Sequence, residues 1–316
     1  MVVQIAITNN DIIQYPVLVD DVKLSQYRRG SPSKLKFTII KDSSLDVQEG
    51  NSVLLQVDGT SVFYGFVFEK SRKGSAANKV EITAYDQLRY LKNKDTFSYK
   101  ATADELIRMI ASKYYLSVGE LAQTGYKLSR VESSSALLDI IETALDETVY
   151  YTGKLYTLYD DVGKLTLSNI EALKLPLLVD ASGMCDYTYK TSIDKDTYNQ
   201  IKVLYETDES TVSVVAKDHE NIKKWGVLQL LEKAQGVSPA AKAHSLLNLY
   251  NDKSRTLTLS SVIGDTRVHG GTSIVVKLDL GDMALQNYML VEEATHKFKN
   301  GIHLMDLKVR GGSFVV

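Results

Sequence analysis

Histidine, cysteine and adjacent carboxylates are the residues of this chain whose chemistry could support catalysis or metal binding. Its five histidines stand apart in the sequence, and no two take the i, i+4 spacing with which a helix presents two imidazoles to zinc. His296 and His303 could face each other across the last predicted hairpin, and together with Cys185 they could in principle bind a metal. Isolated histidines in strands are usually surface or pairing residues, so we expect neither a metal nor a cofactor.

Two pairs of adjacent acids, Asp160-Asp161 and Glu292-Glu293, could supply a general acid and a general base. Neighbouring side chains of a strand point to opposite faces, so neither pair can converge on one substrate. Asp160-Asp161 also precedes Gly163, which is typical of a turn. Cys185 has no histidine near it in the sequence to lower its pKa, which predicts an unreactive thiol.

The sequence patterns of common active sites are missing. The chain has no Gly-x-Ser-x-Gly elbow, no phosphate-binding loop that ends in Lys-Ser or Lys-Thr, and no Gly-x-Gly-x-x-Gly. We therefore expect a protein that is not an enzyme. An active site assembled from residues far apart in the sequence is left open by these patterns.

A repeated block is the strongest pattern in the chain. Val47-x-x-Gly50-x-Ser52-Val53-Leu54-Leu55 returns as Val268-x-x-Gly271-x-Ser273-Ile274-Val275-Val276, and Tyr64-x-x-Val67-x-Glu69 returns as Tyr288-x-x-Val291-x-Glu293. Each copy continues through a charged turn with glycine into an alternating strand. Unrelated hairpins often share such residues, but three blocks that agree in order and spacing favour a duplicated β-unit.

The residues that mark this repeat are candidates for a structural or interface role. Catalysis would not need two copies so far apart, so the acids among them are not expected to be catalytic. The marked positions are Gly50, Ser52, Tyr64, Glu69, Gly271, Ser273, Tyr288 and Glu293.

Composition places the chain among ordinary globular proteins. It has 316 residues, 44% of them hydrophobic, and a net charge of −2, which argues against a dedicated nucleic-acid binder. The basic segments Tyr27-Arg28-Arg29 and Lys34-x-Lys36 are interpreted as the solvated face of a strand and its turn. No long apolar run or basic-then-apolar leader occurs, so we expect neither a membrane span nor a signal peptide. The single Cys185 fits a reducing compartment.

Short strands and tight turns predict β-modules at both ends of the chain, separated by an α+β domain. The expected fold is mainly β with an α+β insertion: two small β-barrel modules flank a central helix-helix-hairpin domain, and the second barrel carries an inserted helix. The predicted domains are residues 1–95 (first β-barrel), 96–190 (central α+β) and 191–316 (second β-barrel).

Helical periodicity locates the predicted helices. A stripe of apolar residues predicts a helix over 101–115 with Thr102 as its N-cap, and a second over 134–148 capped by Ser133 or Ser134. The inserted helix is predicted over 239–250, with Ser238 as N-cap and a proline at its first position.

Several longer strings resemble the phage baseplate hub proteins of the PBSX XkdQ type, which are related to the late control protein D family. The resemblance covers nearly the whole chain, and its specificity comes from the order of the strings rather than from one motif. The strings are Tyr64-Gly-Phe-Val-Phe-Glu69, Val80-Glu-Ile-Thr-Ala-Tyr-Asp-Gln-Leu-Arg-Tyr-Leu-Lys-Asn93, Ala144-Leu-Asp-Glu-Thr148, Asp196-Thr-Tyr-Asn-Gln-Ile-Lys-Val203, Leu290-Val-Glu-Glu-Ala-Thr-His296 and Gly301-Ile-His-Leu-Met-Asp-Leu307.

The resemblance implies a structural hub in the baseplate of a contractile tail, without catalytic residues. Such a hub is a homotrimer whose two barrels per chain alternate around a ring, so that three copies offer six similar positions to a hexameric tail tube and a true three-fold to the central spike. Baseplate wedge and tape measure proteins would be further partners. The expected location is the bacterial cytoplasm during assembly and then the baseplate of a virion or headless, bacteriocin-like particle.

Two other classes of function stay open at this point. The first is a cell-wall hydrolase carried on a tail tip, and the second is a glycan- or receptor-binding module, since the chain has 19 tyrosines. The sequence does not distinguish a complete phage from a phage-tail-like injection device, nor does it show which faces would bind tube, spike or tape measure.

Overall fold

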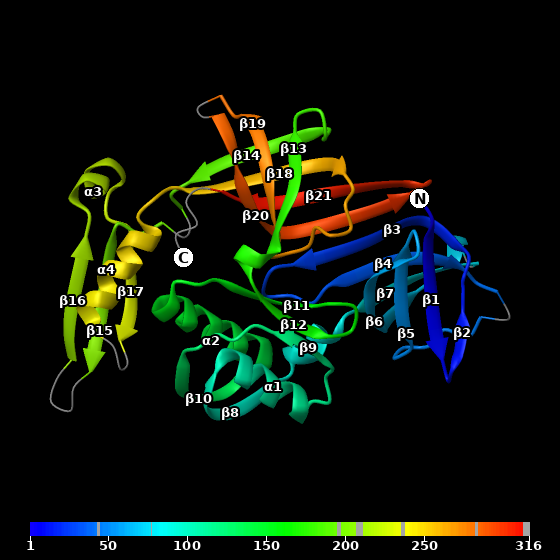
Figure 1. Cartoon of the computed structure of the whole chain (residues 1–316), viewed down its shortest axis with the longest axis horizontal. Coiled ribbons are helices and arrows are strands. Elements are labelled where there is room, and N and C mark those ends of the chain that lie inside the picture. The colour runs from blue at the N-terminus through cyan, green and yellow to red at the C-terminus, as the bar shows by residue number, and fades with distance from the viewer. Residues whose placement is uncertain are drawn as a thin grey trace. The chain divides into compact units, whose positions relative to one another are not determined.

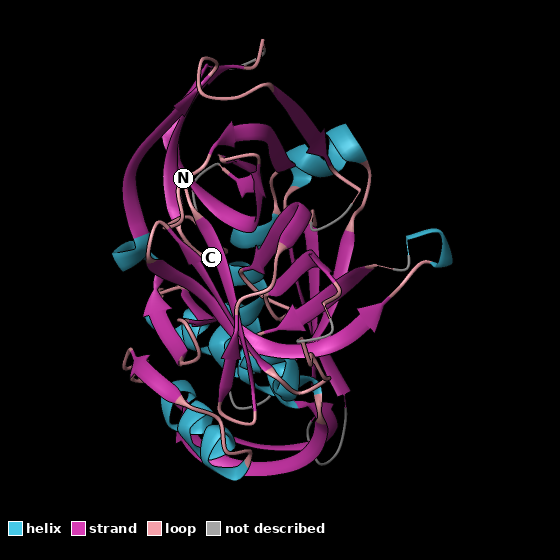
Figure 2. Ribbon diagram, turned by 90° about the vertical axis from the view of Figure 1, so that its right-hand side faces the viewer, coloured by secondary structure: helices cyan, strands magenta, loops and turns pink. Residues whose placement is uncertain are grey.

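The computed structural model describes residues 1–42, 45–76, 78–194, 197–206, 211–234, 238–281 and 284–311. Strands make up most of these residues, and a few helices accompany them (Figure 2). The chain divides into two compact units. The first contains Met1–Tyr187 and Thr258–Arg310, and the second is built from Thr188–Leu257.

The N-terminal module of the first unit consists of strands, as expected from its alternating sequence. In β5 every second residue is buried, and Asp58 and Gly59 in the turn to β6 have φ of 48° and 80°, the conformation that a two-residue hairpin requires. Ile5, Leu35, Phe37, Leu55 and Ile82 form part of its core. The strands are β1 (Val3–Asn9), β2 (Ile12–Gln14), β3 (Leu18–Tyr27), β4 (Lys34–Ile40), β5 (Ser52–Val57), β6 (Thr60–Ser71) and β7 (Lys79–Tyr85), with the 3₁₀ turn η1 (Gly74–Ala76) before β7.

The central segment packs two helices on short strands around its own core. Leu106, Ile107 and Ile110 of α1 and Leu137 and Ile141 of α2 are fully buried in that core. The elements are η2 (Gln87–Lys92), β8 (Lys94–Thr102), α1 (Ala103–Lys113), β9 (Val118–Leu121), β10 (Lys127–Ala136), α2 (Leu137–Thr152), β11 (Tyr156–Asp160), β12 (Leu165–Asn169) and η3 (Ile170–Leu173).

One of the two predicted helix caps in this segment is confirmed and the other is wrong. Thr102 caps α1 in a capping box with Glu105. The cap of α2 is Ala136, without a side-chain hydrogen bond, and Ser133 and Ser134 lie in β10. β10 continues to Ala136 through an irregularity between Glu132 and Ser135, so both serines belong to the strand and not to the start of the helix.

The C-terminal module repeats the strand order of the N-terminal module. The neighbours in the sheet run β1-β5-β6-β7-β4-β3 in the first module and β13-β19-β20-β21-β18-β14 in the second, and the strands follow the same sequence along the chain. One difference is that β13 is parallel to β19, whereas β1 is antiparallel to β5. The second set is β13 (Lys174–Asp180), β14 (Asp186–Ser192), β18 (Ser254–Ile263), β19 (Ser273–Asp279), β20 (Ala284–Lys299) and β21 (Ile302–Arg310).

The two modules share one sheet rather than forming separate closed barrels. β3 of the first module pairs antiparallel with β20 of the second, and these two strands lie side by side in Figure 1. Together the strands of the two modules form a 13-stranded sheet that stays open, with β2 at one end and β14 at another. The fold is thus mainly β as predicted. The sequence did not predict the open sheet. The alternation of apolar and polar residues within a strand does not determine which strands pair with each other.

The second unit is a small α/β insertion between β14 and β18. Its strands pair in the order β16-β15-β17, and Ala243, Leu246 and Leu247 of α4 are buried with Ile201 and Val203 of β15. Ser238 caps α4 as predicted. β15, β16 and β17, which fall within the second barrel predicted at 191–316, thus form a sheet of their own, which α4 covers. The elements are β15 (Gln200–Glu206), β16 (Thr211–Lys217), α3 (His219–Trp225), β17 (Gln229–Ala234) and α4 (Pro239–Tyr250).

Candidate functional site

The glycines that mark the repeat occupy equivalent turns. Gly50 and Gly271 have φ of 89° and 99°, where a residue without a side chain is favoured. Their amides donate to the carbonyls of Val67 and Val291, both at 2.8 Å. Val67 and Val291 in turn donate to the residues that follow the two glycines, at 2.9 and 2.8 Å. The backbone of the two blocks is thus bonded in the same way.

The tyrosines and glutamates of the repeat also have matching registers. Tyr64 lies opposite Leu54, and Tyr288 lies opposite Val275, which is the equivalent residue. Both long strands then carry an irregularity at the same place, immediately before Glu69 in β6 and Glu293 in β20. Because β-bulges are retained features of related sheets, their shared position supports a common origin for the two modules.

The repeat positions differ in what covers them. Glu69 is exposed, whereas Glu293 is half-buried opposite Tyr27. Burial, and then the charge of Glu293, raise the pKa of Tyr27 above its usual range. Ser273 is 1% exposed beside β13, whereas Ser52 is half-buried. The same backbone therefore forms an internal contact in the second module and an open surface in the first.

The two marked tyrosines both contact segments outside their own hairpins. A side chain at Gly163, in the turn between β11 and β12, would lie 2.7 Å from the ring of Tyr64. The ammonium group of Lys174 lies 5.5 Å from the ring centre of Tyr288. Tyr64 thus packs against the central segment, whereas Tyr288 contacts β13 of its own module.

The junction between β3 and β20 contains directed polar contacts as well as the strand ladder. Arg28 Nε donates to Glu292 Oε2 at 2.8 Å, and the Arg28 amide donates to the Glu292 carbonyl at 3.0 Å. The hydroxyl groups of Ser25 and Thr295 lie 3.0 Å apart across the ladder. Arg28 is 9% exposed, so the prediction that it decorates a solvated face is wrong. A buried arginine that loses its carboxylate partner is costly, so this pair fixes the junction.

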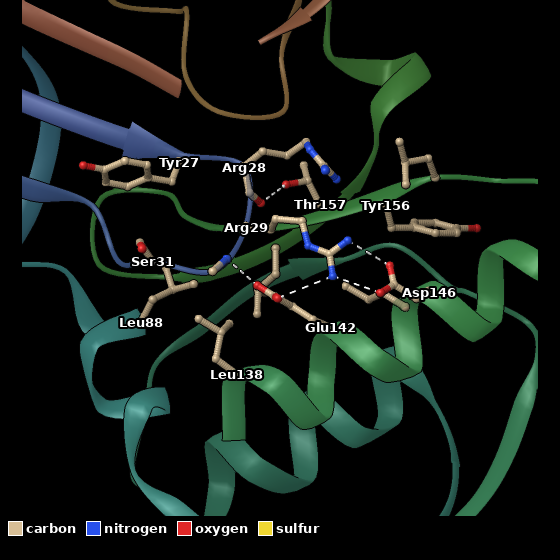
Figure 3. A pocket seen from close by; sticks show the side chains of 14 residues that line it. Tyr27, Arg28, Arg29, Ser31, Leu88, Leu138, Glu142, Asp146, Tyr156 and Thr157 are labelled. Atoms are coloured by element: carbon tan, nitrogen blue, oxygen red, sulfur yellow. Dashed lines mark hydrogen bonds and ion pairs between the residues drawn. The ribbon is translucent and has the colours of Figure 1, made fainter. Parts of the chain in front are cut away.

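The loop after β3 binds the central helix α2 through ion pairs and hydrogen bonds. Arg29 lies between two carboxylates of that helix, with nitrogens 3.0 and 2.9 Å from Asp146 and 3.5 Å from Glu142 (Figure 3). The Gly30 amide donates to Glu142, and the Thr157 hydroxyl donates to the Arg28 carbonyl at 3.0 Å. The cavity among these residues measures about 20 Å³. That volume holds about one water molecule, so this place is a structural clamp rather than a ligand pocket.

A buried polar link connects the first module to the central segment. Asp86 accepts from the amides of Ser33 and Leu88, and Gln87 donates to Asp160 at 2.9 Å. Burial, and then the charge of Asp160, raise the pKa of Asp86 to about 8. Asp160 also accepts from the Gly163 amide, as expected for turn chemistry. These acids organise a turn and a helix start.

The predicted approach of two histidines across the last hairpin is present. His296 Nδ1 lies 2.9 Å from His303 Nε2, and His296 Nε2 lies 2.8 Å from the Val268 carbonyl. The carbonyl can only accept, so His296 carries its proton on Nε2 and accepts from His303. Burial, and then His303, lower the pKa of His296 to about 3. The pair is a neutral hydrogen-bonded link in the second module.

Within the described ranges, no three residues of the histidine, cysteine, aspartate or glutamate type gather as a metal site would need. Cys185 is an exposed free thiol, and among the described residues it does not gather with His296 and His303 into such a group. Among the described helices, none has the length and apolarity needed to cross a bilayer.

The fold of this chain recurs in solved structures of phage tail proteins. The 43 kDa tail protein of prophage MuSo2 from Shewanella oneidensis superposes with a TM-score of 0.69 at 12% identity, over 97% of this chain and 98% of that one. A tail protein from Neisseria meningitidis MC58 gives the same TM-score and identity, over 98% and 96%. A type VI secretion system component of Escherichia coli, described as structurally similar to the T4 tail proteins gp27 and gp5, gives 0.56 at 9% identity, over 95% of this chain and 75% of that one.

The chain belongs to the YQBQ-like family, whose model matches residues 22–310. Two Bacillus subtilis (strain 168) proteins, the phage-like element PBSX protein XkdQ and the uncharacterized protein YqbQ, are each 28% identical over 306 residues. That match spans 93% of this chain and 92% of each relative. The resemblance seen in the sequence is therefore confirmed at the level of the family.

The β3–β20 junction was missed by reasoning from the sequence. Two signals pointed to it: the adjacent Gly270-Gly271 at the start of the second repeat, and the adjacent Arg28-Arg29 at the end of β3. A side chain at Gly270 would lie 2.2 Å from the backbone of Tyr27 and Arg28, so this glycine is where β3 passes. Neither signal alone predicts the junction, because the two segments are far apart in the sequence and meet only in the fold.

Proposed function

We propose that the chain is the structural hub of the baseplate of a contractile phage tail or tail-like particle. Its family includes a protein named for the phage-like element PBSX, and its fold is that of phage tail proteins. The hub is a homotrimer that joins a hexameric tail tube to a trimeric central spike. Its place of assembly is the bacterial cytoplasm, and its final location is the baseplate of the particle.

The observation that carries this proposal is the same strand order occurring twice in one chain. Matching turns, registers and bulges make the two modules alike in backbone, and the β3–β20 ladder holds them side by side. Three such chains in a closed ring present six similar modules. They keep a true three-fold at the same time, so one ring can meet partners of six-fold and three-fold symmetry.

The modules act in this proposal as barrel-like units of the ring, and the central segment lies outside it. The division at residues 95 and 190 remains a prediction about which parts fold as domains. In the same proposal, the open surface of the first module around Gly50 and Glu69 is an interface. Tape measure and baseplate wedge proteins are further partners of the hub.

A mass measurement tests this function. Light scattering during size-exclusion chromatography at rising concentration should reach three times the 35.2 kDa of one chain. A stable dimer or tetramer would contradict the proposal. Clearing of peptidoglycan by the purified chain in a zymogram would instead favour a tail-tip hydrolase.

A further inference from the structure

β2 is a sheet edge with free backbone groups. The turn before it, Asn10-Asp11, has φ of 46° and 66°, so Asn9 and Ile12 form the hydrogen-bonded pair that closes a two-residue hairpin. Hydrogen-bonded and non-hydrogen-bonded pairs alternate along an antiparallel ladder, so the amide and the carbonyl of Ile13 point away from β1. Among the described strands β2 pairs with β1 alone, which leaves these two groups without a strand partner.

The side chains along this edge are apolar and exposed. Ile12 is 62% exposed, Ile13 57% and Tyr15 59%. Apart from Asp11, residues 2–19 carry no charged side chain. Natural proteins usually protect an edge with charges or with a covering segment, and an exposed apolar patch marks a site of interaction. The edge of β2 is therefore expected to take up another strand.

One segment of the chain has the composition that suits this edge. Residues 312–316, Gly-Ser-Phe-Val-Val, carry no charged side chain and contain the aromatic and β-branched residues that favour strands. They lie outside the described residues and follow Gly311. Pro16 has no amide hydrogen and ends the free edge, so the available stretch, Asp11–Tyr15, has the same length as the 312–316 segment.

The 312–316 segment cannot lie along β2 of its own chain. It leaves the sheet after Arg310, which lies opposite Leu290 of β20. Phe298, farther along β20, is the residue of that strand that is buried in the core of the first module. The stretch from Leu290 to Phe298 is about 26 Å long, whereas residues 311–316 span at most about 22 Å. The segment that covers β2 therefore comes from another copy.

We propose that the 312–316 segment of one copy adds as a strand to the free edge of β2 in a second copy. The added strand supplies hydrogen bonds to the backbone of Ile13 and covers apolar side chains, which is the β-augmentation mode of recognition. Each copy gives one segment and receives one, so the contact is head-to-tail and can close into a ring. The inference rests on the proposed hub function and names one contact that joins its chains.

Charge favours a parallel direction for the added strand. Asp11 is exposed at the turn end of β2, and Asp46 accepts a hydrogen bond from the side chain of Asn9 at 2.9 Å at the same end. Arg310 has a 55% exposed side chain and stands just before the segment. A parallel strand places this arginine beside the two carboxylates, whereas an antiparallel strand places it at the opposite end, and such complementarity fixes register.

The concentration at which the trimer forms measures the contribution of the contact. Deletion of residues 312–316 removes the added strand, and Ile13→Lys places a charge on the edge. By light scattering, each variant should need a roughly ten-fold or more higher concentration than the full chain to form the trimer. Ile263→Lys is the matched control and should leave the trimer unchanged, since Ile263 is 68% exposed at the end of β18.

Disulfide formation locates the contact. In the parallel register that begins at Asp11, Val316 lies beside Tyr15. In a Cys185→Ser background, Tyr15→Cys with Val316→Cys should therefore give covalent dimers and trimers on a non-reducing gel, since neighbouring thiols have a high effective concentration.

Two further pairs complete this test. Ile263→Cys with Val316→Cys places the first thiol on an exposed strand residue of the second module, so it should give far fewer covalent oligomers. Tyr15→Cys with Phe314→Cys keeps the same face of the added strand and covers a shift of register by two residues.

The outcomes separate this contact from the hub function. Cross-linked trimers, together with weaker trimers of the deletion and Ile13→Lys variants, support both. A trimer that survives the deletion and forms no cross-link at either position of the segment would overturn the contact and leave the hub intact. Disulfides formed only within one chain would overturn the exchange between copies. A full chain that stays monomeric at high concentration and forms no cross-link would overturn both.

Discussion

Gly270 is the residue on which the joining of the two modules depends most sharply. Its position gives β3 a path along β20, because the backbone atoms of Tyr27 and Arg28 lie where a β-carbon would be. The atoms in the way belong to the main chain of a paired strand, so they cannot turn aside as the end of a long side chain would.

Gly270→Ala should therefore lower the free energy of unfolding by about 2 kcal/mol or more, as overpacking does elsewhere. Gly74→Ala is the matched control, since its β-carbon would meet nothing within 4 Å and its φ is not left-handed. Urea unfolding of both variants measures the difference. Equal stability of the two variants would show that β3 does not pass Gly270 as described.

His296 makes the second module sensitive to acid. Its pKa lies at about 3, against the ordinary 6.5, because burial and then His303 disfavour its charge. In the unfolded chain, His296 becomes protonated as the pH falls below about 6.5. In the folded chain, it becomes protonated only near pH 3. The stabilisation is thus complete above pH 6.5 and is lost as the pH falls toward 3. Among its titratable neighbours, His303 and His269 lower the pKa of His296 and Asp265 raises it.

Between pH 7.5 and pH 5, the wild type should lose roughly 2 kcal/mol more stability than His296→Gln, which cannot take up the proton. Asp86 titrates in the opposite sense, since its pKa is raised, but it is present in both proteins and cancels in the comparison. Urea unfolding at the two pH values gives the four free energies. An equal loss of stability in both proteins would mean that His296 is already charged or solvated in the folded protein.

Residues close in sequence were easier to predict than residues brought together by the fold. The facing of His296 and His303 followed from a single hairpin, and the turn at Asp160 followed from the nearby Gly163. The burial of Arg28 did not follow, because its partner Glu292 is 264 residues away. Alternation shows that a side chain lies on one face of a strand, but not what covers that face.

At the scale of elements, the residue that caps the start of α1 was predicted correctly, and the residue that caps the start of α2 was not. Thr102 is both the last residue of β8 and the cap of α1, and its box with Glu105 is complete. Ser133 and Ser134 had the right chemistry but were held in β10, so α2 begins after Ala136 without a side-chain cap. Both serines lie in the irregular part of β10 between Glu132 and Ser135, where the Ser134 amide donates to the Thr96 hydroxyl group at 3.4 Å.

Thr102→Ala should destabilise the first unit by about 1 kcal/mol, the usual cost of losing a cap. Thr102→Ser, which keeps the hydroxyl group, is the matched control and should recover most of the loss. Thermal or urea unfolding followed by circular dichroism measures both variants. If serine did no better than alanine, the loss would come from packing of the methyl group and not from the cap.

At the scale of the whole molecule, the repeat was visible in the sequence but its extent was not. Three short blocks marked β5 to β7 and β19 to β21, whereas the shared order of six strands per module appeared only in the sheet. The helix at 239–250 was recognised as an insertion, yet the strands before it were placed in the second barrel. A strand's alternation is the same in either sheet, so the sequence could not assign them.

The central claim is that three chains with two alike modules each form one ring. Electron microscopy of the assembled particle, averaged without imposed symmetry, tests it most directly. The account predicts a closed ring of three chains with six similar lobes of density, in which every second boundary lies between chains. A ring with three unlike lobes, an open assembly or single separate chains under all conditions would contradict it.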